Sequence, residues 1–443
     1  MSRQIHDRPH ALYVAWGFPP SRGGGVYRAL ASANGLVEAG FDVTVLTCER
    51  EAFERFTGVD PSLEAAVHPA IEVVRLPFDW PAKEVDIRRW PEARAQQPVA
   101  WLLRRQEEDR RDFPETSYGH WAKPLEEAAL AIHAQRPVDL VIGTANPNVD
   151  LVPALVLHER FGVPFVYDHR DTWTLDMYNE CEANTDDPRV AEIELRLVSD
   201  SVETWFVNEP IADWHRQRYP EHAEKILAVP NGFDPDFSPL PAPRRAAQEN
   251  GPVRFGYIGT MTPYMPMQEF VDAWAIAADR LAPGEAAADF YGYLGFYGTP
   301  HRGLSALFAD ADESGARYLG PLPKGQVRDV YAGFDVLLLI IGSGRYLTSG
   351  KVYEYMASGL PIVSVHDPSI DASRVLADYP GWFPAASLEP ADIADALVAA
   401  AEAVRQATLP SLEAATSHAQ AYERSRILGP RFDRLFTLIT GKD

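Results

Sequence analysis

The chain has 443 residues, 46% of them hydrophobic, which is too long for one ordinary core and indicates two domains. Its 63 acidic residues outnumber 41 basic ones, and the formal net charge of −22 excludes a protein that binds nucleic acid through a basic surface. Any phosphate that the chain binds must therefore be held by backbone amides and a few well-placed cations.

Two cysteines, Cys48 and Cys181, are too few for a disulfide framework or a thiolate metal cage, and they favour a reducing compartment. The polar N-terminus leads directly into an apolar strand without a signal-type segment. No apolar run approaches the ~18 residues that a membrane span needs. We therefore expect a cytoplasmic protein, and contact with the cytoplasmic face of a membrane stays open.

Short apolar runs alternate with amphipathic helical stretches along the whole chain. The expected strands are 11–18, 42–48, 71–77, 138–144, 164–170, 203–208, 225–232, 253–259, 288–295, 316–321, 335–341 and 361–365. This alternation predicts parallel sheets covered by helices on both faces. The fold class is α/β, with two Rossmann-like, doubly wound sheets that bind ligands at the carboxyl ends of their strands.

A stretch rich in proline, asparagine and glycine, residues 229–251, predicts the domain boundary because a new strand begins directly after it. We expect a first domain at 1–232, with a helical insertion at about 80–125, and a second domain at 233–415. The last segment, 416–443, is predicted to form helices that are broken at Gly429-Pro430 and either cap a domain or cross back over the first one.

Three glycines, Gly23, Gly24 and Gly25, lie in the turn between the first expected strand and the helix after it. They let backbone N–H groups approach an anion closely, next to the positive end of a helix. Arg28 occupies the place of the third glycine of a dinucleotide-binding fingerprint, and no Gly-Lys-Ser/Thr follows, so neither that fingerprint nor a P-loop is present. An anion site and an ordinary glycine turn both stay open.

Four ionisable residues, Asp168, His169, Arg170 and Asp171, follow the expected strand 164–170. They lie where parallel sheets bind their ligands, which indicates a functional site. A loop tied together by salt bridges is the structural alternative, and spacing alone assigns no general acid or base.

The stretch TSGKVYEYMASGLPIVSV (348–365) predicts a short helix that begins near Gly350 and ends at Gly359. The amides at its start point to an anion, and Lys351 adds a positive charge. Glu354, one turn later, reaches ribose hydroxyls if the phosphates of a nucleotide lie at the helix start. The alternative is an ordinary helix–turn–strand unit in which Glu354 is an exposed surface acid.

Taken in order, these segments resemble the retaining glycosyltransferases of the GT-B fold, most closely glycosyltransferase family 4. Residues 18–47 are similar to the glycine-loop signature of that family, VPNGFDPDF (229–237) to its interdomain element, FGYIGTM (255–261) to the first strand of its second domain, and KVYEYMASGLPIVSV (351–365) to its nucleotide-sugar site. The resemblance covers most of the chain and weakens between about 50 and 135. It implies an acceptor-binding first domain and a donor-binding second domain that face a cleft.

The resemblance also implies roles for single residues. Those implied to bind the nucleotide diphosphate sugar are Gly24, Gly25, Thr260, Pro321, Leu322, Arg345, Ser349, Gly350, Lys351, Val352 and Glu354. Those implied for catalysis are His169 or Arg170, depending on where a gap is placed, and Asp171 after them. No metal and no resident cofactor is expected, because helix ends and cations neutralise the leaving diphosphate.

The chain departs from the family pattern at two places. The first of two glutamates seven residues apart is replaced by Tyr346, so the donor sugar would be read by the backbone of 342–350 or by Arg345. After GYIG, where the family has an arginine and a lysine, this chain has Thr260 and Thr262, which leaves Lys351, Arg345 or Arg170 as the cations.

We therefore expect a glycosyltransferase that moves a sugar, with retention, from a nucleotide diphosphate donor to a small-molecule, glycan or lipid-linked acceptor. A nucleotide-sugar epimerase and a non-catalytic nucleotide-sugar-binding protein are the alternatives. Segment 88–121, which bears arginines and tryptophans, either rests on a membrane surface or packs on its own domain.

Overall fold

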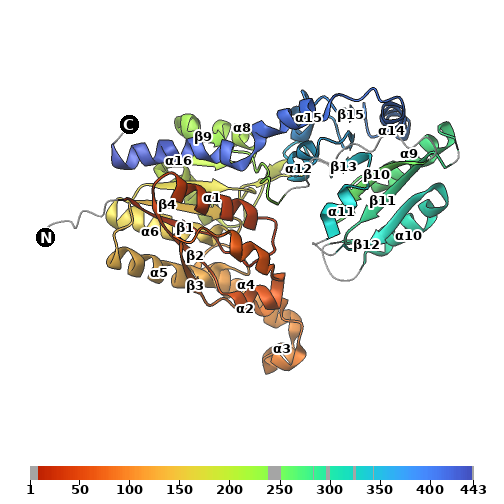
Figure 1. The fold of residues 1–443 in the computed structure, drawn as a ribbon. Helices are drawn as coiled ribbons and strands as arrows, with labels where there is room; N and C mark the ends of the chain where they lie inside the picture. The colour runs from red at the N-terminus through yellow and green to blue at the C-terminus, as the bar shows by residue number, and fades with distance from the viewer. Residues whose placement is uncertain are drawn as a thin grey trace. The chain divides into compact units, whose positions relative to one another are not determined.

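The computed structural model describes residues 8–237, 251–282, 284–295, 300–322, 326–342 and 344–441. Contacts divide the chain into two compact units, each of which is described by itself (Figure 1). Unit 1 consists of Met1–Asp176, Cys181–Asn231 and Arg424–Asp443, and unit 2 of Met177–Glu180 and Gly232–Glu423. The division falls one residue before the boundary expected at 232, and 416–423 lie with unit 2. Residues 238–250 of the expected linker lie outside the described residues.

Unit 1 is built on a parallel sheet with the order β3-β2-β1-β4-β5-β8-β9 in the part of the chain that the structure describes. Its strands are β1 (His10–Val14), β2 (Asp42–Cys48), β3 (Glu72–Leu76), β4 (Leu140–Ala145), β5 (Phe165–His169), β8 (Glu203–Phe206) and β9 (Ile226–Ala228). The winding changes direction between β1 and β4. The loops after β1, β4 and β5 therefore meet at the edge where doubly wound sheets bind ligands.

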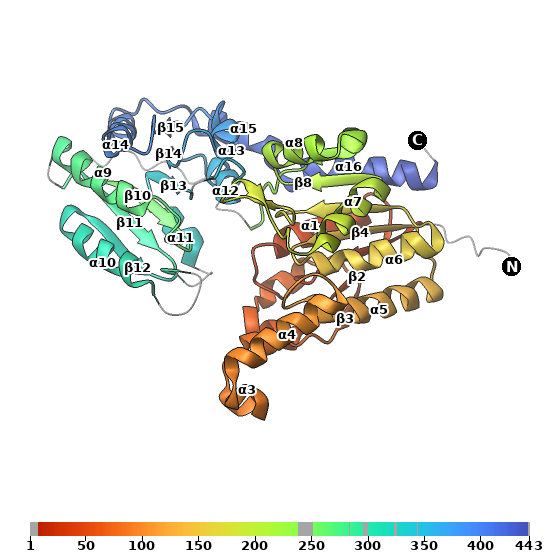
Figure 2. The same cartoon turned by 180° about the vertical axis from the view of Figure 1, so that it is seen from behind.

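Helices cover this sheet on both sides. They are α1 (Val26–Glu38), α2 (Arg50–Ala52), α3 (Glu92–Gln96), α4 (Pro98–Asp112), α5 (Ala122–Gln135), α6 (Val152–Phe161), α7 (Pro188–Asp200), α8 (Glu209–Arg218) and α16 (Arg424–Thr440). Leu36 of α1 and Phe432 of α16 share one buried cluster with Tyr13 of β1. Away from that cluster, α5 and α6 pack against each other (Figure 2).

The predicted break at Gly429-Pro430 is wrong, because α16 runs through both residues. A proline inside a helix removes a hydrogen bond and costs about 3 kcal/mol. The helix persists because Leu428, Phe432 and Leu435 are buried in the core of unit 1, and full burial of each large apolar side chain contributes roughly 1.5–3 kcal/mol.

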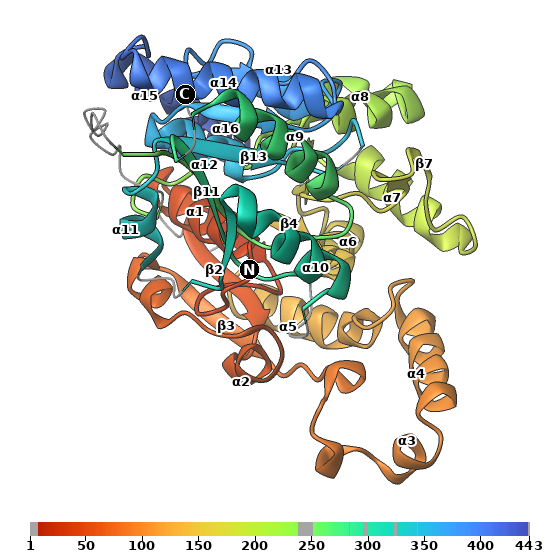
Figure 3. The same ribbon diagram turned by 90° about the vertical axis from the view of Figure 1, so that its right-hand side faces the viewer.

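The segment between β3 and β4 forms the helical insertion that the sequence predicts. It holds α3, α4 and short 3-10 turns at Pro81–Lys83, Ile87–Arg89 and Gly119–Trp121. The α3 end of this segment extends away from the body of unit 1 in all three ribbon views, most clearly in Figure 3. At the other end Trp121 is buried, and its Nε1 donates to the carbonyl of Pro77 at 3.1 Å.

Two very short strands, β6 (Leu175–Asp176) and β7 (Cys181–Glu182), pair antiparallel. The sequence does not predict these strands, because two residues are too few to show an alternation of apolar and polar side chains. The turn between them, Met177–Glu180, belongs to unit 2 by its contacts.

Unit 2 repeats the doubly wound order in its described residues, β12-β11-β10-β13-β14-β15, again all parallel. Its strands are β10 (Val253–Ile258), β11 (Ala286–Tyr291), β12 (Ala316–Gly320), β13 (Val336–Ile340), β14 (Ile362–Val365) and β15 (Trp382–Pro384). Each predicted strand run forms a strand in one unit or the other, and β15 is a further strand that the sequence does not predict.

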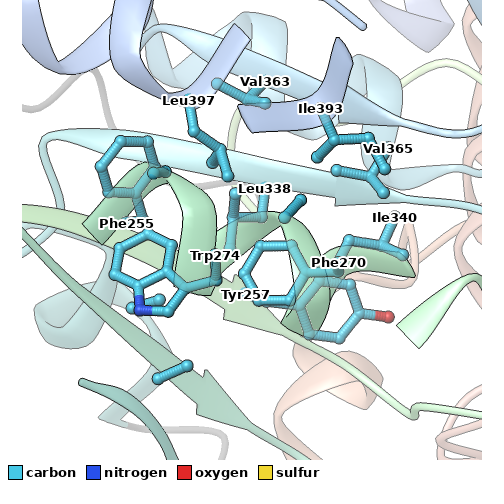
Figure 4. Close-up of a cluster of buried hydrophobic side chains, with 14 of the residues drawn as sticks. Phe255, Tyr257, Phe270, Trp274, Leu338, Ile340, Val363, Val365, Ile393 and Leu397 are labelled. Atoms are coloured by element: carbon cyan, nitrogen blue, oxygen red, sulfur yellow. The ribbon is translucent and has the colours of Figure 1, made fainter. Parts of the chain in front are cut away.

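The helices of unit 2 are α9 (Met267–Arg280), α10 (Arg302–Ala311), α11 (Val327–Tyr331), α12 (Lys351–Ser358), α13 (Asp371–Leu376), α14 (Pro390–Arg405) and α15 (Leu412–Ala419). Alternate residues of β13 face opposite sides of the sheet. Leu338 and Ile340 join the cluster with α9 and α14 that Figure 4 shows. Leu337 and Leu339 join the cluster with α12 and α13. Burial on both faces explains why the sequence of β13 is apolar without a break.

Candidate functional site

The start of α12 in unit 2 is formed by Ser349, Gly350 and Lys351. Oγ of Ser349 accepts the amide of Lys351 at 3.3 Å, and the carbonyl of Ser349 accepts the amide of Val352 at 3.0 Å. Gly350 is exposed, and a Cβ there would meet nothing within 4 Å. The helix therefore begins at the predicted residues and presents its positive end without a covering side chain at Gly350.

Lys351 lies over the carboxyl end of β10. Its Nζ is 3.3 Å from the hydroxyl of Tyr257 and 4.9 Å from the centre of that ring. A Cβ added at Gly259 would overlap the ammonium group, so glycine leaves the room that Lys351 occupies. Among the described residues no carboxylate forms an ion pair with Lys351. The helix start and this ammonium together form a positive region whose charge the described residues do not neutralise.

At their carboxyl ends, the backbones of β10, β11 and β12 contact one another closely. The amide of Gly259 donates to Tyr291 at 2.8 Å, and the amide of Gly292 donates to Gly320 at 2.9 Å. All three glycines have positive φ. The predicted residue Thr260 directly follows Gly259, and Pro321 and Leu322 directly follow Gly320. They therefore lie at the same edge of the sheet as Lys351.

Arg345 precedes α12 and is already paired. Its Nη2 donates to the hydroxyl of Tyr346 at 2.6 Å, and its Nε lies 3.4 Å from Oε2 of Glu180. Its amide also donates to Glu180 at 3.0 Å. Tyr346 is buried. Of Arg345 and Lys351, Lys351 is therefore the one whose charge is available to an anion. Glu354 lies one turn further along the same helix and is half-buried.

The loop before α12 is anchored by Asp371, a residue that no sequence motif singles out. Thr348 donates its hydroxyl to Oδ2 of Asp371 at 2.7 Å, and Nε of Arg374 donates to Oδ1 at 2.7 Å. The Asp371 side chain is buried. Thr348 is two residues from Gly350, so this carboxylate helps to fix the helix start.

In unit 1 the glycine loop and Arg170 lie together. A Cβ added at Gly25 would overlap Nη1 of Arg170, whereas Gly24 has open space around it. The Arg170 side chain is oriented by a main-chain carbonyl, because its Nη2 donates to the carbonyl of Asn146 at 2.8 Å. In the described part of the chain no carboxylate pairs with Arg170, not even its neighbour Asp171, which is half-buried.

His169 points to the other side of the sheet. Its Nδ1 lies 2.5 Å from the hydroxyl of Tyr167, and its ring contacts that of Phe206. Burial lowers the pKa of His169 to about 3, so the ring is neutral at physiological pH. Side chains alternate along a strand, which is why Asp168 and Arg170 face α1 while Tyr167 and His169 do not. The structure brings Arg170, and not His169, to the glycine loop.

The side of β5 that carries His169 leads into a buried polar network around Glu194. This carboxylate accepts from Thr174 Oγ1 at 2.5 Å and from the Tyr219 hydroxyl at 2.7 Å, and His215 Nε2 lies 3.7 Å from its Oε1. Burial by itself raises the pKa of Glu194, but these partners outweigh it and lower the pKa to about 2. The network is a charged but internal part of unit 1.

Arg28, which excludes the dinucleotide fingerprint, forms a buried ion pair with Asp168. It also donates Nη1 to the carbonyls of Val229 and Pro230, at 3.0 and 3.1 Å. One side chain thus connects the helix after the glycine loop, the end of β5 and the VPNG turn. This role of Arg28 is not visible in the sequence, since its partners are far apart along the chain.

Comparisons with solved structures find similar folds along almost the whole chain. The Anabaena protein HepE, solved in complex with UDP, matches with 15% identity and a TM-score of 0.63, covering 97% of this chain and 100% of that one. Sucrose-phosphate synthase from Thermosynechococcus elongatus matches with 13% identity and a TM-score of 0.61, covering 98% and 99%. The chain has the GT-B fold. No protein-family model and no curated protein matches the sequence.

A similar fold also occurs in a protein named for another reaction. The putative UDP-N-acetylglucosamine 2-epimerase from Listeria monocytogenes matches with 10% identity and a TM-score of 0.54, covering 98% of both chains. The fold by itself therefore does not separate sugar transfer from epimerisation. In the described residues, no helix is both long enough and apolar enough to span a bilayer.

Proposed function

We propose that the protein is a retaining glycosyltransferase, related to family 4, that uses a nucleotide diphosphate sugar. The observation that supports this most directly is the ammonium of Lys351, which contacts the Tyr257 hydroxyl but no carboxylate of the described residues, beside Gly259 and the start of α12. An ammonium and a helix start at the carboxyl edge of a parallel sheet suit a diphosphate.

In this proposal each residue near α12 has a separate task. Lys351 and the amides of Gly350 and Val352 stabilise the negative charge that develops on the leaving diphosphate. Glu354, one turn along the helix, accepts hydrogen bonds from the ribose. Pro321 and Leu322 lie against the base, and no metal is required of the chain.

Unit 1 is proposed to bind the acceptor. Arg170 beside Gly25 is suited to the transferred sugar or the distal phosphate, and His169, which is buried and neutral, is not. The diphosphate itself would take the proton of the acceptor hydroxyl, so that Asp171 is not required as a base.

The test is a thermal-shift screen of the full chain with UDP, GDP, dTDP and ADP, followed by a transfer assay with the sugar of the base that binds. A ligand that binds the folded state raises the melting temperature. We expect Lys351→Ala to remove most of this shift, Lys351→Arg to keep part of it, and Lys123→Ala, a change at an exposed lysine of unit 1, to leave it intact. Full binding by Lys351→Ala would refute the assignment.

Epimerisation is the second candidate, favoured by the fold match to the Listeria protein. It needs no acceptor. Incubation of the chain with the donor sugar nucleotide alone separates the two reactions, because only an epimerase produces an isomeric sugar nucleotide. A chain that binds the donor but yields neither transfer nor isomer would be a binding protein.

A membrane contact is proposed for the projecting part of the insertion. Four large apolar side chains are exposed there, Val85 by 88%, Ile87 by 72%, Val99 by 71% and Leu103 by 61%. Apolar side chains next to arginines suit the interface of a bilayer. Sedimentation with neutral and anionic vesicles tests this contact: Val99→Ser/Leu103→Ser should reduce binding, and no binding to either vesicle would discard it.

A further inference from the structure

Tyr257 contacts the ammonium group of Lys351 with two different parts of its side chain. Nζ of Lys351 lies 3.3 Å from the hydroxyl oxygen and 4.9 Å from the centre of the ring. An ammonium group has three N–H donors and no acceptor, so the hydroxyl oxygen accepts from it. The face of an aromatic ring also attracts a cation. In the described part of the chain, the ammonium makes no other polar contact.

The proton of the Tyr257 hydroxyl is used by another group. The hydroxyl donates to the carbonyl of Thr260 at 3.1 Å. The sulfur of Met265, 4.0 Å from the same oxygen, is only a weak acceptor. A hydroxyl has one proton and two lone pairs, so a proton directed at Thr260 leaves the lone pairs for Lys351. One hydroxyl therefore connects Lys351 with the loop that follows β10.

Tyr257 itself is held firmly by its neighbours. It is buried in the core cluster of unit 2 together with Phe270 and Trp274 (Figure 4). Its ring stacks on that of Phe290 from the adjacent strand, with 5.9 Å between the ring centres. Side chains in a close-packed core stay in one rotamer. The hydroxyl of Tyr257 is therefore a fixed point at the carboxyl edge of the sheet.

Lys351 benefits from a fixed contact because a lysine side chain is long and flexible. A lysine without such a contact occupies many rotamers, and ordering it at a ligand costs conformational entropy that reduces affinity. Gly259 restricts the ammonium from one side, since a Cβ there would overlap Nζ and lie 3.3 Å from the Tyr257 hydroxyl. Tyr257 and Gly259 together define where the charge of Lys351 lies before any ligand binds.

We propose that Tyr257 is a positioning residue for Lys351. Its hydroxyl holds the ammonium over the carboxyl end of β10, ready for the phosphates of a nucleotide, and it does not itself touch the ligand. This inference rests on the proposed function and deepens it. The affinity for a nucleoside diphosphate then belongs to the pair of Tyr257 and Lys351, and a lysine alone at position 351 is not sufficient for it.

The experiment is a double-mutant cycle on the full chain. It compares the wild type, Tyr257→Phe, Lys351→Ala and the variant with both changes. The probe is whichever of UDP, GDP, dTDP and ADP raises the melting temperature of the wild type most. Calorimetry measures its Kd, and saturation-transfer NMR follows the weaker binding of the Lys351→Ala chains. Tyr257→Phe removes the hydroxyl and keeps the ring that packs on Phe290.

Tyr379→Phe is the matched control. Tyr379 is also a buried tyrosine of unit 2, and its hydroxyl donates to the carbonyl of Leu360 at 2.8 Å, beyond the other end of α12. Melting curves of the two tyrosine variants without ligand should fall by a similar amount, because each loses one buried hydrogen bond to a main-chain carbonyl. A difference in Kd between them therefore does not come from a general loss of stability.

We expect Tyr257→Phe to raise the Kd about fivefold to tenfold, the effect of one hydrogen bond, and Tyr379→Phe to bind like the wild type. In the Lys351→Ala chain the same Tyr257→Phe change should alter the Kd by less than about twofold, because no ammonium is left to position. Unchanged or tighter binding by Tyr257→Phe overturns the inference. An equal loss with and without Lys351 also overturns it, because Tyr257 would then act through the loop at Thr260.

The wild type separates these outcomes from a failure of the proposed function. If the wild type binds a nucleoside diphosphate and the cycle shows no coupling, only the positioning role of Tyr257 is lost. If none of the four nucleotides binds to the wild type, the proposed function fails, and the role of Tyr257 fails with it.

Discussion

Arg28 and Asp168 form a bidentate ion pair that is closed to solvent, with Nη2 to Oδ1 at 2.7 Å and Nε to Oδ2 at 3.0 Å. Thr144 adds a hydroxyl bond to the same carboxylate at 3.1 Å. Removing one partner leaves a buried charge without its counter-charge, so we expect Asp168→Asn to lower the free energy of unfolding by about 3–5 kcal/mol.

Urea unfolding measures this loss. The matched control is Glu54→Gln, which breaks an exposed pair with Arg50 and should cost less than about 1 kcal/mol. An equal loss in the free energy of unfolding of both variants would show that the buried ion pair stabilises unit 1 no more than an exposed one does.

Gly25→Ala should displace the guanidinium of Arg170, because the new Cβ would occupy its place. A long side chain can move aside, so we expect the melting temperature to change little. If Arg170 stabilises transition-state charge, the transfer rate should fall about 100-fold. Steady-state kinetics and a melting curve check both parts. Gly429→Ala is the control, because a Cβ at this glycine would meet open space. A transfer rate of Gly25→Ala equal to that of the wild type would contradict the role of Arg170.

His169 predicts a pH dependence of stability. Its pKa is lowered from 6.5 to about 3 in the folded chain, first by burial. The unfolded state therefore binds more protons between these values, so the stabilising contribution is present above pH 6.5 and is lost as the pH falls. Between pH 6.5 and 4.5 the loss should reach about 2–3 kcal/mol.

His169→Asn, which keeps an acceptor near the Tyr167 hydroxyl, should remove this contribution from the slope, while other groups that titrate in the same range, such as Glu115 with its pKa raised by burial to about 7, contribute equally in both chains. Glu194 does not contribute to the slope between pH 6.5 and 4.5. Its pKa is lowered to about 2, so its contribution to the free energy of unfolding is lost only as the pH falls below 4.5, the value in the unfolded chain. Urea unfolding at a series of pH values compares the two chains. Parallel profiles would mean that His169 does not cause the slope.

Thr348→Val tests whether Asp371 positions the start of α12. The variant loses the 2.7 Å hydroxyl bond to Asp371 and keeps the shape of the side chain. We expect a stability loss of about 1 kcal/mol and a Kd for the nucleoside diphosphate that rises about fivefold. Ser387→Ala removes a similar bond to Asp392 in the same unit, and calorimetry should show an unchanged Kd for that control.

The sequence was sufficient for features that depend on neighbours in the chain. Apolar runs of several residues form strands because residues buried on both faces of a sheet are apolar, and α12 begins after Gly350 and ends at Gly359, as the sequence predicts. The strands that were missed, such as β15, are too short to show a pattern. The helix break predicted at Pro430 is wrong, because the packing of α16 on the core of unit 1 outweighs the intrinsic cost of a proline in a helix.

Features that depend on distant partners were not predictable. Arg28 was read only as a residue that breaks a motif, and its partner Asp168 lies 140 residues away. The pairing of Lys351 with Gly259 likewise joins two separate motifs. The choice between His169 and Arg170 was accessible in principle, because the alternation of a strand places them on opposite faces. That choice also requires knowing which face of the sheet α1 covers, and the sequence does not show this.

The contact between Asn231 and Arg424 determines which truncations of this chain can fold. Nε of Arg424 donates to the carbonyl of Asn231 at 2.6 Å, so the point where the chain leaves unit 1 touches the point where it returns. A truncation after 231 would strip α16 from α1 and expose an apolar face, and we expect such a fragment to aggregate. A short glycine linker from 231 to 424 would instead make unit 1 a contiguous gene product, suitable for expression without its partner unit.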